Sequence, residues 1–426
     1  MNILFKNIKI VSPEDGINTK TDLLIVNGII EKIGKVKEIP KDIEIVEAGN
    51  LTCVPGFFDM HVHFRIPGQE HKEDLETGSN AAMSGGFTGV LCMPNTNPPL
   101  DNPKLIKQLR KKSEDSLLDV EYTACISKHR QGQELADIPA LHKAGAKWFT
   151  DDGSPVENPQ LMRRAFEETA KLGSIIIQHA EDMQLSNHGV INEGRVSRKL
   201  GLKGIPSISE TVIIARDVEI CKFVKNARYH VQHVSCADSV DMIRNAKWKG
   251  INATTEVCPH HFILTDNSLM KYGTNAKMNP PLRTKNDVEA ILEGLRDGTI
   301  DVICTDHAPH SAKEKAMGLN KAPFGIVGLE TCIGLTYTYL VQKKIISFKE
   351  MIYRLSINPR KIMKLNPIKM QEGVKANLTI LDTNRKWKID KSKFLSKSKN
   401  TPFDGFNVTC RPFCVINNNK ITYSSL

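Results

Sequence analysis

The sequence predicts an α/β protein built on a (β/α)8 TIM-type barrel, with a small β-sandwich-like domain formed by both chain ends. Three observations indicate this class. Eight apolar, strand-like runs follow one another between residues 54 and 307, helix-like stretches separate most of them, and the two ends contain only strand-like segments. Eight strands alternating with helices over roughly 300 residues are typical of this barrel. We expect the barrel at residues 55–365 and the two parts of the small domain at 1–54 and 366–426.

The chain ends are expected to pair with each other. ILFKNIKIVS is apolar and partly alternating, and LLIVNGIIEKIG places Asn27-Gly28 between two apolar runs, which is a strong hairpin signal. The stretches ANLTILD and CVINNNKITY near the C-terminus have the same character. Together these segments predict one small β domain.

The central runs and the stretches between them carry the barrel prediction. The runs are VPGFFDMHV, FTGVLCM, VEYTACI, AKWFTD, SIIIQHA, YHVQHVS, INATTEV and DVICTDH. Helical spacing of apolar residues occurs in PQLMRRAFEETAKLG, ETVIIARDVEICKFVKN and ADSVDMIRNAKWKG. A doubly wound sheet is the alternative, but GGFTG lacks the phosphate-binding GxGxxG pattern.

Composition excludes several classes of protein. The formal charge of +10 is spread along the chain without a block of five or six basic residues, so we expect no nucleic-acid partner. No stretch reaches the roughly 20 apolar residues of a membrane span, so we expect no membrane partner. The ten cysteines stand singly, without a CxxC pair, as expected for reduced thiols of a cytoplasmic protein.

Polar residues end most of the predicted strands, where barrel enzymes usually carry their catalytic groups. These residues are Asp59, His61, His63 and Arg65, then Asn95, Asp151, Asp152, His179 and His233, and finally Asp306, His307 and His310. Burying such groups unpaired costs roughly several kcal/mol each, which a shared cation removes. Imidazole and carboxylate ligands without cysteine suit zinc, with manganese or cobalt as substitutes.

In the stretch DMHVHFR, the alternation of side chains along a strand accounts for the spacing of the first two histidines. Residues i and i+2 of a strand project to the same face. His61 and His63 are therefore expected to point into the barrel, while Val62 packs outward.

Longer motifs resemble those of a known family. They are PGFFDMHVHFRIPGQEHKED, MPNTNPP, FTDDG, QHAED, QHVS, EVCPHH, NPPLR, TDHAPH and APFGIVGLE. Over essentially its whole length the chain resembles the cyclic amidohydrolases of the amidohydrolase superfamily, and more narrowly the class I bacterial dihydroorotases. One departure is Ile66, where that family usually carries Glu.

The resemblance implies a centre that holds one or two Zn²⁺ ions. Its ligands would be His61, His63 and Asp306 on one side and His179 and His233 on the other, with Asp152 bridging. In many relatives a carboxylated lysine bridges instead, and Lys147 stands at the matching place. The FTDDG context favours Asp152.

The resemblance also implies a reaction, the reversible cyclisation of N-carbamoyl-L-aspartate to L-dihydroorotate with loss of water, the third step of de novo pyrimidine (UMP) synthesis. Asp306 would act as the catalytic proton carrier. Arg65, Asn95 and His310 would bind the substrate carboxylate, and Asn279 the pyrimidine edge. We expect His260 and His261 to be structural.

Two alternatives remain at this point. An allantoinase or hydantoinase would share the metal ligands but needs no carboxylate clamp. A non-catalytic partner of aspartate transcarbamoylase would lack ligands, whereas all six candidates are present. We expect a small-molecule substrate and a homodimer; association with that transcarbamoylase is left open.

Overall fold

The computed structural model describes residues 1–426 and contains all eight central strands. They are β6 (Phe57–Val62), β7 (Phe87–Cys92), β8 (Asp119–Tyr122), β9 (Trp148–Phe149), β10 (Ile175–Gln178), β13 (Tyr229–Val231), β14 (Ala253–Val257) and β15 (Val302–Ile303). The α/β class predicted from the sequence is confirmed.

These strands pair side by side in a closed circuit, and every pairing is parallel. One sheet has the order β6-β7-β8 and the other the order β15-β14-β13-β10-β9. Isolated parallel bridges join the two sheets at both edges, Ala124 with Phe149 and Val62 with His307. The carboxyl ends of all eight strands therefore face the same way.

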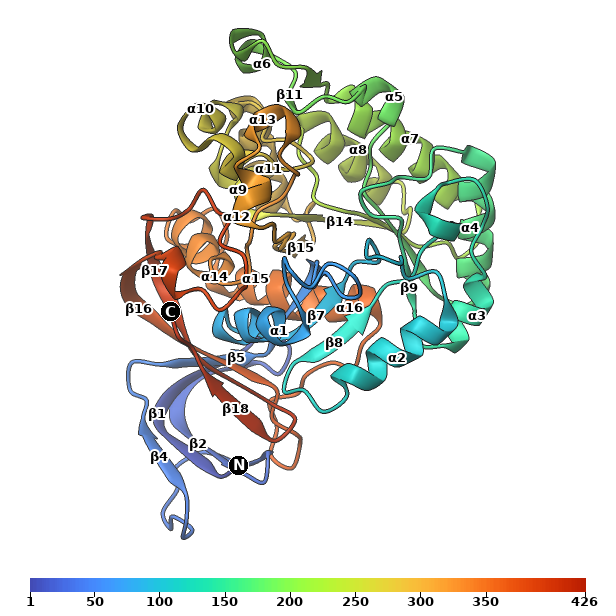
Figure 1. Ribbon diagram of the computed structural model, residues 1–426. Coiled ribbons are helices and arrows are strands. Elements are labelled where there is room, and N and C mark those ends of the chain that lie inside the picture. The colour runs from blue at the N-terminus through green and yellow to red at the C-terminus, as the bar shows by residue number, and fades with distance from the viewer.

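Helices follow the strands and cover the outside of the circuit (Figure 1). The longer ones are α1 (Leu75–Ser84), α2 (Pro103–Ser113), α4 (Pro159–Lys171), α7 (Ile208–Phe223), α8 (Ala237–Trp248) and α11 (Lys285–Asp297). Shorter ones are α3 (Ile138–Lys143), α5 (Met183–Ser186), α6 (Arg195–Leu200), α9 (Pro259–Ile263), α10 (Leu269–Tyr272), α12 (Ala312–Lys315), α13 (Gly318–Lys321), α14 (Cys332–Thr336), α15 (Phe348–Ile352) and α16 (Asn358–Met363). A two-stranded sheet of β11 (Ile191–Asn192) and β12 (Gly204–Ile205) lies beside α6.

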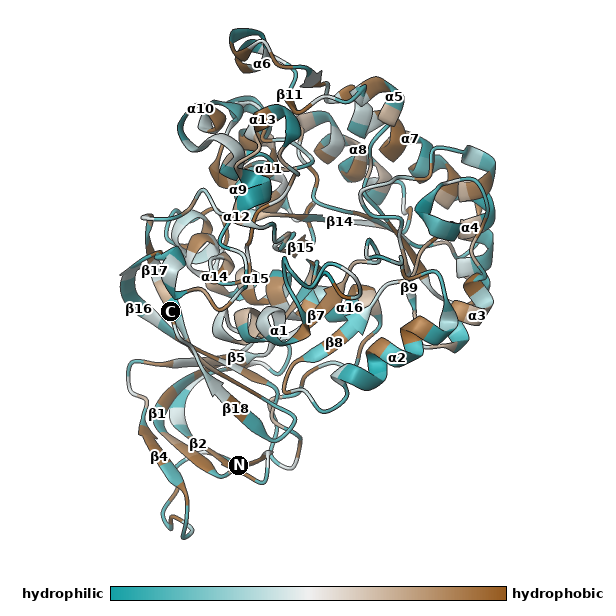
Figure 2. Cartoon of the chain, in the orientation of Figure 1, coloured by the Kyte–Doolittle hydropathy of each residue, from teal (hydrophilic) through white to brown (hydrophobic).

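The sequence of α4 shows how such a helix forms. Asn158 caps it by accepting hydrogen bonds from the backbone of Gln160 and Leu161, and Pro159 occupies the first turn, where no backbone donor is needed. Its buried face repeats at helical spacing through Leu161, Ala165 and Phe166. In Figure 2 hydrophobic and hydrophilic residues accordingly alternate along α2 and α4.

Segments from both chain ends share one eight-stranded sheet (Figure 1). It contains β1 (Ile3–Ser12), β2 (Ile17–Val26), β3 (Ile29–Ile33), β4 (Glu44–Glu47), β5 (Thr52–Pro55), β16 (Leu378–Lys388), β17 (Asn407–Asn417) and β18 (Lys420–Tyr423). Asn27 and Gly28 turn the β2–β3 hairpin with φ of 51° and 74°, the left-handed conformation that this turn requires.

Alternating side chains of the central strands divide into two apolar layers. Phe58, Leu91, Ile177 and Val302 belong to a compact inner cluster. Their neighbours along each strand join the large cluster of 63 residues between strands and helices. Polar side chains, by contrast, follow the carboxyl ends of several of these strands. No helix is both long and apolar enough to cross a membrane.

Candidate metal centre

A cavity of about 300 Å³ opens at the carboxyl ends of the central strands. Nine of the ten site residues expected from the sequence line it: His63, Arg65, Asn95, Asp152, His179, His233, Asn279, Asp306 and His310. The tenth, His61, is fully buried next to them. Strands far apart in the chain thus bring the whole set together.

His61 and His63 face two carboxylates. His61 Nε2 lies 3.5 Å from Oδ1 of Asp152 and 3.5 Å from Oδ1 of Asp306. His63 Nε2 lies 3.0 Å from Oδ1 of Asp306 and 3.7 Å from Oδ2 of Asp152. His61, His63 and Asp152 satisfy the spacing of a metal-binding group, with ligand atoms within 4.8 Å of one another.

A second such group shares Asp152. Asp152, His179 and His233 also have ligand atoms within 4.8 Å of one another. His179 Nδ1 lies 4.0 Å from Oδ1 of Asp152 and 3.1 Å from Nε2 of His233. Because Asp152 belongs to both groups, it stands between the two pairs of histidines.

Two groups of this centre have pKa shifts that suit a cation, whereas nearby carboxylates outweigh burial and raise the pKa of His61 and of His179. Hydrogen bonding and charge from His61 outweigh the effect of burial and hold the pKa of Asp152 well below its usual range. Burial, together with His179 and His61, holds the pKa of His233 well below its usual range. His61 Nε2 is buried without a hydrogen-bond partner. An ionised carboxylate, a neutral imidazole and an orphaned nitrogen at one point fit a divalent metal ion.

Carboxylates behind two histidines fix the orientation of their rings. Glu256 Oε1 lies 2.8 Å from His61 Nδ1, and Glu181 Oε2 lies 3.0 Å from His179 Nε2. A carboxylate on the far nitrogen of a ligating histidine orients the ring and increases its basicity. The sequence analysis missed both. Glu256 is the penultimate residue of β14 and is buried. An unpaired acid is rare at a buried position, and that was the available signal.

Asn95 and Asn279 make contacts to these residues as well as lining the cavity. The Asn95 side chain lies 2.8 Å from His63 Nδ1 through Oδ1 and donates to Asp152 Oδ2 at 2.9 Å through Nδ2. Asn279 Nδ2 donates to Glu181 Oε2 at 2.7 Å. Both asparagines therefore orient metal-binding candidates.

Arg65 supplies a positive charge at the cavity wall. Its Nε donates to the Pro309 carbonyl at 3.3 Å, and its Nη2 lies 3.3 Å from Nε2 of His310. No carboxylate forms a salt bridge with it at 4.0 Å or less. Burial lowers the pKa of Arg65 to about 10, against the attraction of Asp306 and Asp152, so it stays cationic at neutral pH.

Lys147 and Asp152 occupy different environments. Lys147 precedes β9 and its side chain is exposed, whereas Asp152 is buried at the cavity. Of these two residues, Asp152 lines the cavity and Lys147 does not.

Three cavity residues have strained backbones. The φ angles of Arg65, His233 and Asp306 are 57°, 27° and 47°, in the left-handed region that side chains other than glycine rarely adopt. Such strain gathers at functional sites, where the surrounding fold maintains it.

Comparison with known proteins agrees with this geometry. A solved structure of an L-hydantoinase (dihydropyrimidinase) from Arthrobacter aurescens matches with a TM-score of 0.87 at 26% identity, covering 100% of this chain and 96% of that one. A dihydropyrimidinase from Brevibacillus agri shares the fold, with a TM-score of 0.85 at 20% identity over 100% and 95% of the two chains. The fold and the histidine–aspartate set together define an amidohydrolase.

Proteins related in sequence identify the family within this class. A family model described as "Dihydro-orotase-like" matches residues 50–239. Dihydroorotases from Ruminiclostridium cellulolyticum and Carboxydothermus hydrogenoformans are 45% and 44% identical, over 97% and 100% of this chain and 96% and 99% of theirs. The chain belongs to the dihydroorotase family.

Proposed function

We propose that the protein catalyses the reversible cyclisation of N-carbamoyl-L-aspartate to L-dihydroorotate, the third step of pyrimidine synthesis. The observation that carries this choice of substrate is Arg65, a buried guanidinium without a carboxylate partner in the same cavity as Asp306. Both the open and the cyclic substrate bring a carboxylate that such a group binds through two parallel hydrogen bonds.

Six side chains would hold the cofactor, which we propose to be one or two Zn²⁺ ions: His61, His63, Asp152, His179, His233 and Asp306. The orphaned Nε2 of His61 and the position of Asp152 between the two histidine pairs support this set. When bound, the cation polarises the reacting carbonyl and makes water a stronger nucleophile at neutral pH.

Asp306 is the proposed proton carrier. Its Oδ1 contacts His63 Nε2 at 3.0 Å, while Oδ2 has no hydrogen bond to the protein. In ring opening this carboxylate takes a proton from the attacking water and gives it to the departing ring nitrogen. In ring closure the proton moves the opposite way, from the attacking amide nitrogen to the oxygen that leaves as water.

The remaining cavity residues would position the substrate. Arg65 binds the carboxylate, with His310 beside the guanidinium limiting its movement. Asn95 orients His63 and Asn279 orients Glu181. Both asparagines also line the cavity, where their amides would lie near the substrate. We infer that the closed circuit of eight parallel strands, residues 55–365, is a (β/α)8 barrel, and that residues 1–54 and 366–426 form the small β domain.

A hydantoinase is the second candidate, because the L-hydantoinase shares the fold across the whole chain. Its ring substrate needs no carboxylate clamp, so Arg65 argues against it. We also propose that the protein forms a homodimer, since two-fold dimers are the commonest oligomers of soluble proteins. Co-purification of the two proteins would test whether it associates with aspartate transcarbamoylase.

Turnover assays test the proposal. Purified protein with Zn²⁺ should open dihydroorotate and leave hydantoin and allantoin unchanged. Asp306→Asn should lower kcat by about 10²–10⁴-fold with an unaltered circular dichroism spectrum. Good turnover of another ring without turnover of dihydroorotate would overturn the assignment.

A further inference from the structure

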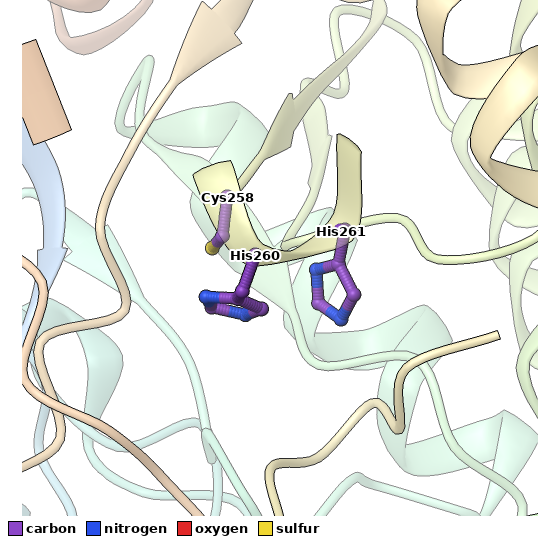
Figure 3. A group of neighbouring side chains, drawn as sticks. All are labelled: Cys258, His260 and His261. Carbon is purple, nitrogen blue, oxygen red and sulfur yellow. The ribbon is translucent and has the colours of Figure 1, made fainter. Parts of the chain in front are cut away.

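A second group of metal-ligand side chains lies outside the centre described above. Cys258, His260 and His261 stand at the junction of β14 and α9, and their ligand atoms all lie within 4.8 Å of one another. Figure 3 shows the three side chains projecting from a single turn of the chain. The two imidazole centroids are 4.3 Å apart, and the three residues are at most 3% exposed.

Each ring has one buried nitrogen without a hydrogen-bond partner, and in His261 the other nitrogen is hydrogen-bonded. His261 Nε2 lies 3.0 Å from the Pro280 carbonyl, so it carries the proton and leaves the lone pair on Nδ1. His261 Nδ1 and His260 Nε2 are buried without any hydrogen-bond partner. A histidine that ligates a metal typically donates its other N–H to a carbonyl or carboxylate in this way. Leaving two such nitrogens unpaired is unfavourable, and a shared cation relieves it.

A second thiol adjoins the group. Cys304 directly follows β15, and its Sγ lies 3.5 Å from the Sγ of Cys258. Both cysteines are free and fully buried. Thiolate and imidazole ligands together are typical of tetrahedral zinc sites.

We propose that Cys258, His260 and His261, with Cys304 as the fourth ligand, bind a Zn²⁺ ion distinct from that of the histidine–aspartate centre. Binding requires the thiolates, so the cysteine protons pass to solvent as the ion enters. Cys258 lies two residues beyond Glu256, and Cys304 lies two residues before Asp306. The ion therefore holds together the ends of β14 and β15. β14 carries Glu256, which orients His61, and β15 is followed by Asp306, the proposed proton carrier.

Cobalt provides a readout specific for this site. Protein freed of metal and reloaded with Co²⁺ should show a near-ultraviolet sulfur-to-cobalt charge-transfer band. None of the six side chains proposed for the histidine–aspartate centre contains sulfur. A band that came from Cys304 beside His61 would not depend on Cys258. Cys258→Ser should weaken the band, because one of the two thiolate ligands is lost, and Cys258→Ser/Cys304→Ser should lose the band and about one equivalent of Co²⁺ per chain. Cys53→Ser, a buried cysteine of the chain-end sheet, should keep both.

X-ray absorption of the zinc-loaded wild type gives a second measurement that needs no variant. A zinc–sulfur shell near about 2.3 Å is expected. Absence of the cobalt band and of the sulfur shell in the wild type, or a band of undiminished intensity in Cys258→Ser, overturns the proposal. Because neither measurement uses turnover, a failed dihydroorotase assay leaves this result unaffected.

Discussion

At the scale of single residues, the site depends on groups that do not line the cavity. Glu256 contacts His61 Nδ1 at 2.8 Å and His230 Nε2 at 3.3 Å. Although burial opposes ionisation, the proximity of these two histidines lowers the pKa of Glu256 to about 2. An ionised Glu256 fixes the His61 proton on Nδ1 and leaves Nε2 free toward Asp152 and Asp306.

Glu256→Gln should therefore weaken metal binding. Glutamine keeps the shape but lacks the charge that orients His61, and loss of such an outer partner costs roughly 10–100-fold in metal affinity. Competition with a chromogenic chelator measures the affinity. Glu193→Gln makes the same change at an exposed position and should bind like the wild type; equal affinities in all three proteins would contradict the role given to Glu256.

A buried acid away from the centre gives a pH dependence of stability. Asp217 of α7 is fully buried, and burial raises its pKa to about 6 despite the neighbouring Arg216. In the unfolded chain an aspartate loses its proton near pH 4. Because the folded state holds the proton to higher pH, its contribution to stability is complete below about pH 4 and is lost as pH rises toward 6.

Asp217→Asn should flatten this dependence. Relative to the variant, the wild type should lose about 3 kcal/mol of unfolding free energy between pH 4 and 7, which corresponds to the two-unit shift. Urea unfolding at several pH values provides the measurement, and Asp115→Asn, an exposed aspartate, is the control. A difference between wild type and Asp217→Asn that does not change with pH would exclude Asp217 as the cause.

At the scale of elements, the pairing of β6 with β7 positions the first two histidines. Gly89 of β7 leaves room for the Phe58 ring on β6, since a Cβ at position 89 would lie 2.5 Å from that ring. Phe58 belongs to the inner apolar cluster and lies three residues before His61 on the same strand. A small residue at position 89 thus sets how closely the two strands approach.

Gly89→Ala should destabilise the protein by about 1–3 kcal/mol, the usual cost of overpacking a core. Thermal unfolding followed by circular dichroism measures the change. At Gly49 the nearest atom to an added Cβ is 3.7 Å away, so Gly49→Ala should cost little. If both variants unfold at the same temperature, the close approach of Phe58 does not limit this pair of strands.

The sequence predicts a feature well when that feature depends on residues close together in the chain, and poorly when it depends on residues far apart. The apolar runs located all eight central strands, including β9 and β15, which have two residues each. The register of β6 shifts between Asp59 and Val62, a pairing irregularity that alternation alone does not reveal. Glu256 reaches His61 across 195 residues, so no local pattern joins them. Glu181 lies only two residues after His179, so its contact with that histidine could have been predicted from the sequence.

At the scale of the whole molecule, the candidate centre links strands that are distant in sequence. Its side chains follow β6, β9, β10, β13 and β15. Without a cation, His61 Nε2 has no hydrogen-bond partner at these strand ends. A ligand that binds only the folded state stabilises it by about 4 kcal/mol when its concentration is 1,000 times Kd. Metal binding and folding of the strand circuit should therefore be coupled.

Removal of the metal should lower the unfolding temperature as well as activity. Dialysis against a chelator is expected to reduce Tm, and added Zn²⁺ to restore it, because the ion favours only the folded state. Calorimetry with metal analysis of the same samples measures both. In Asp152→Asn, which lacks the shared carboxylate, the difference between loaded and stripped protein should shrink. Running the comparison also in Cys258→Ser/Cys304→Ser separates the two proposed sites. The shift that remains in this variant belongs to the histidine–aspartate centre, and its absence would mean that metal binding at this centre is not coupled to folding.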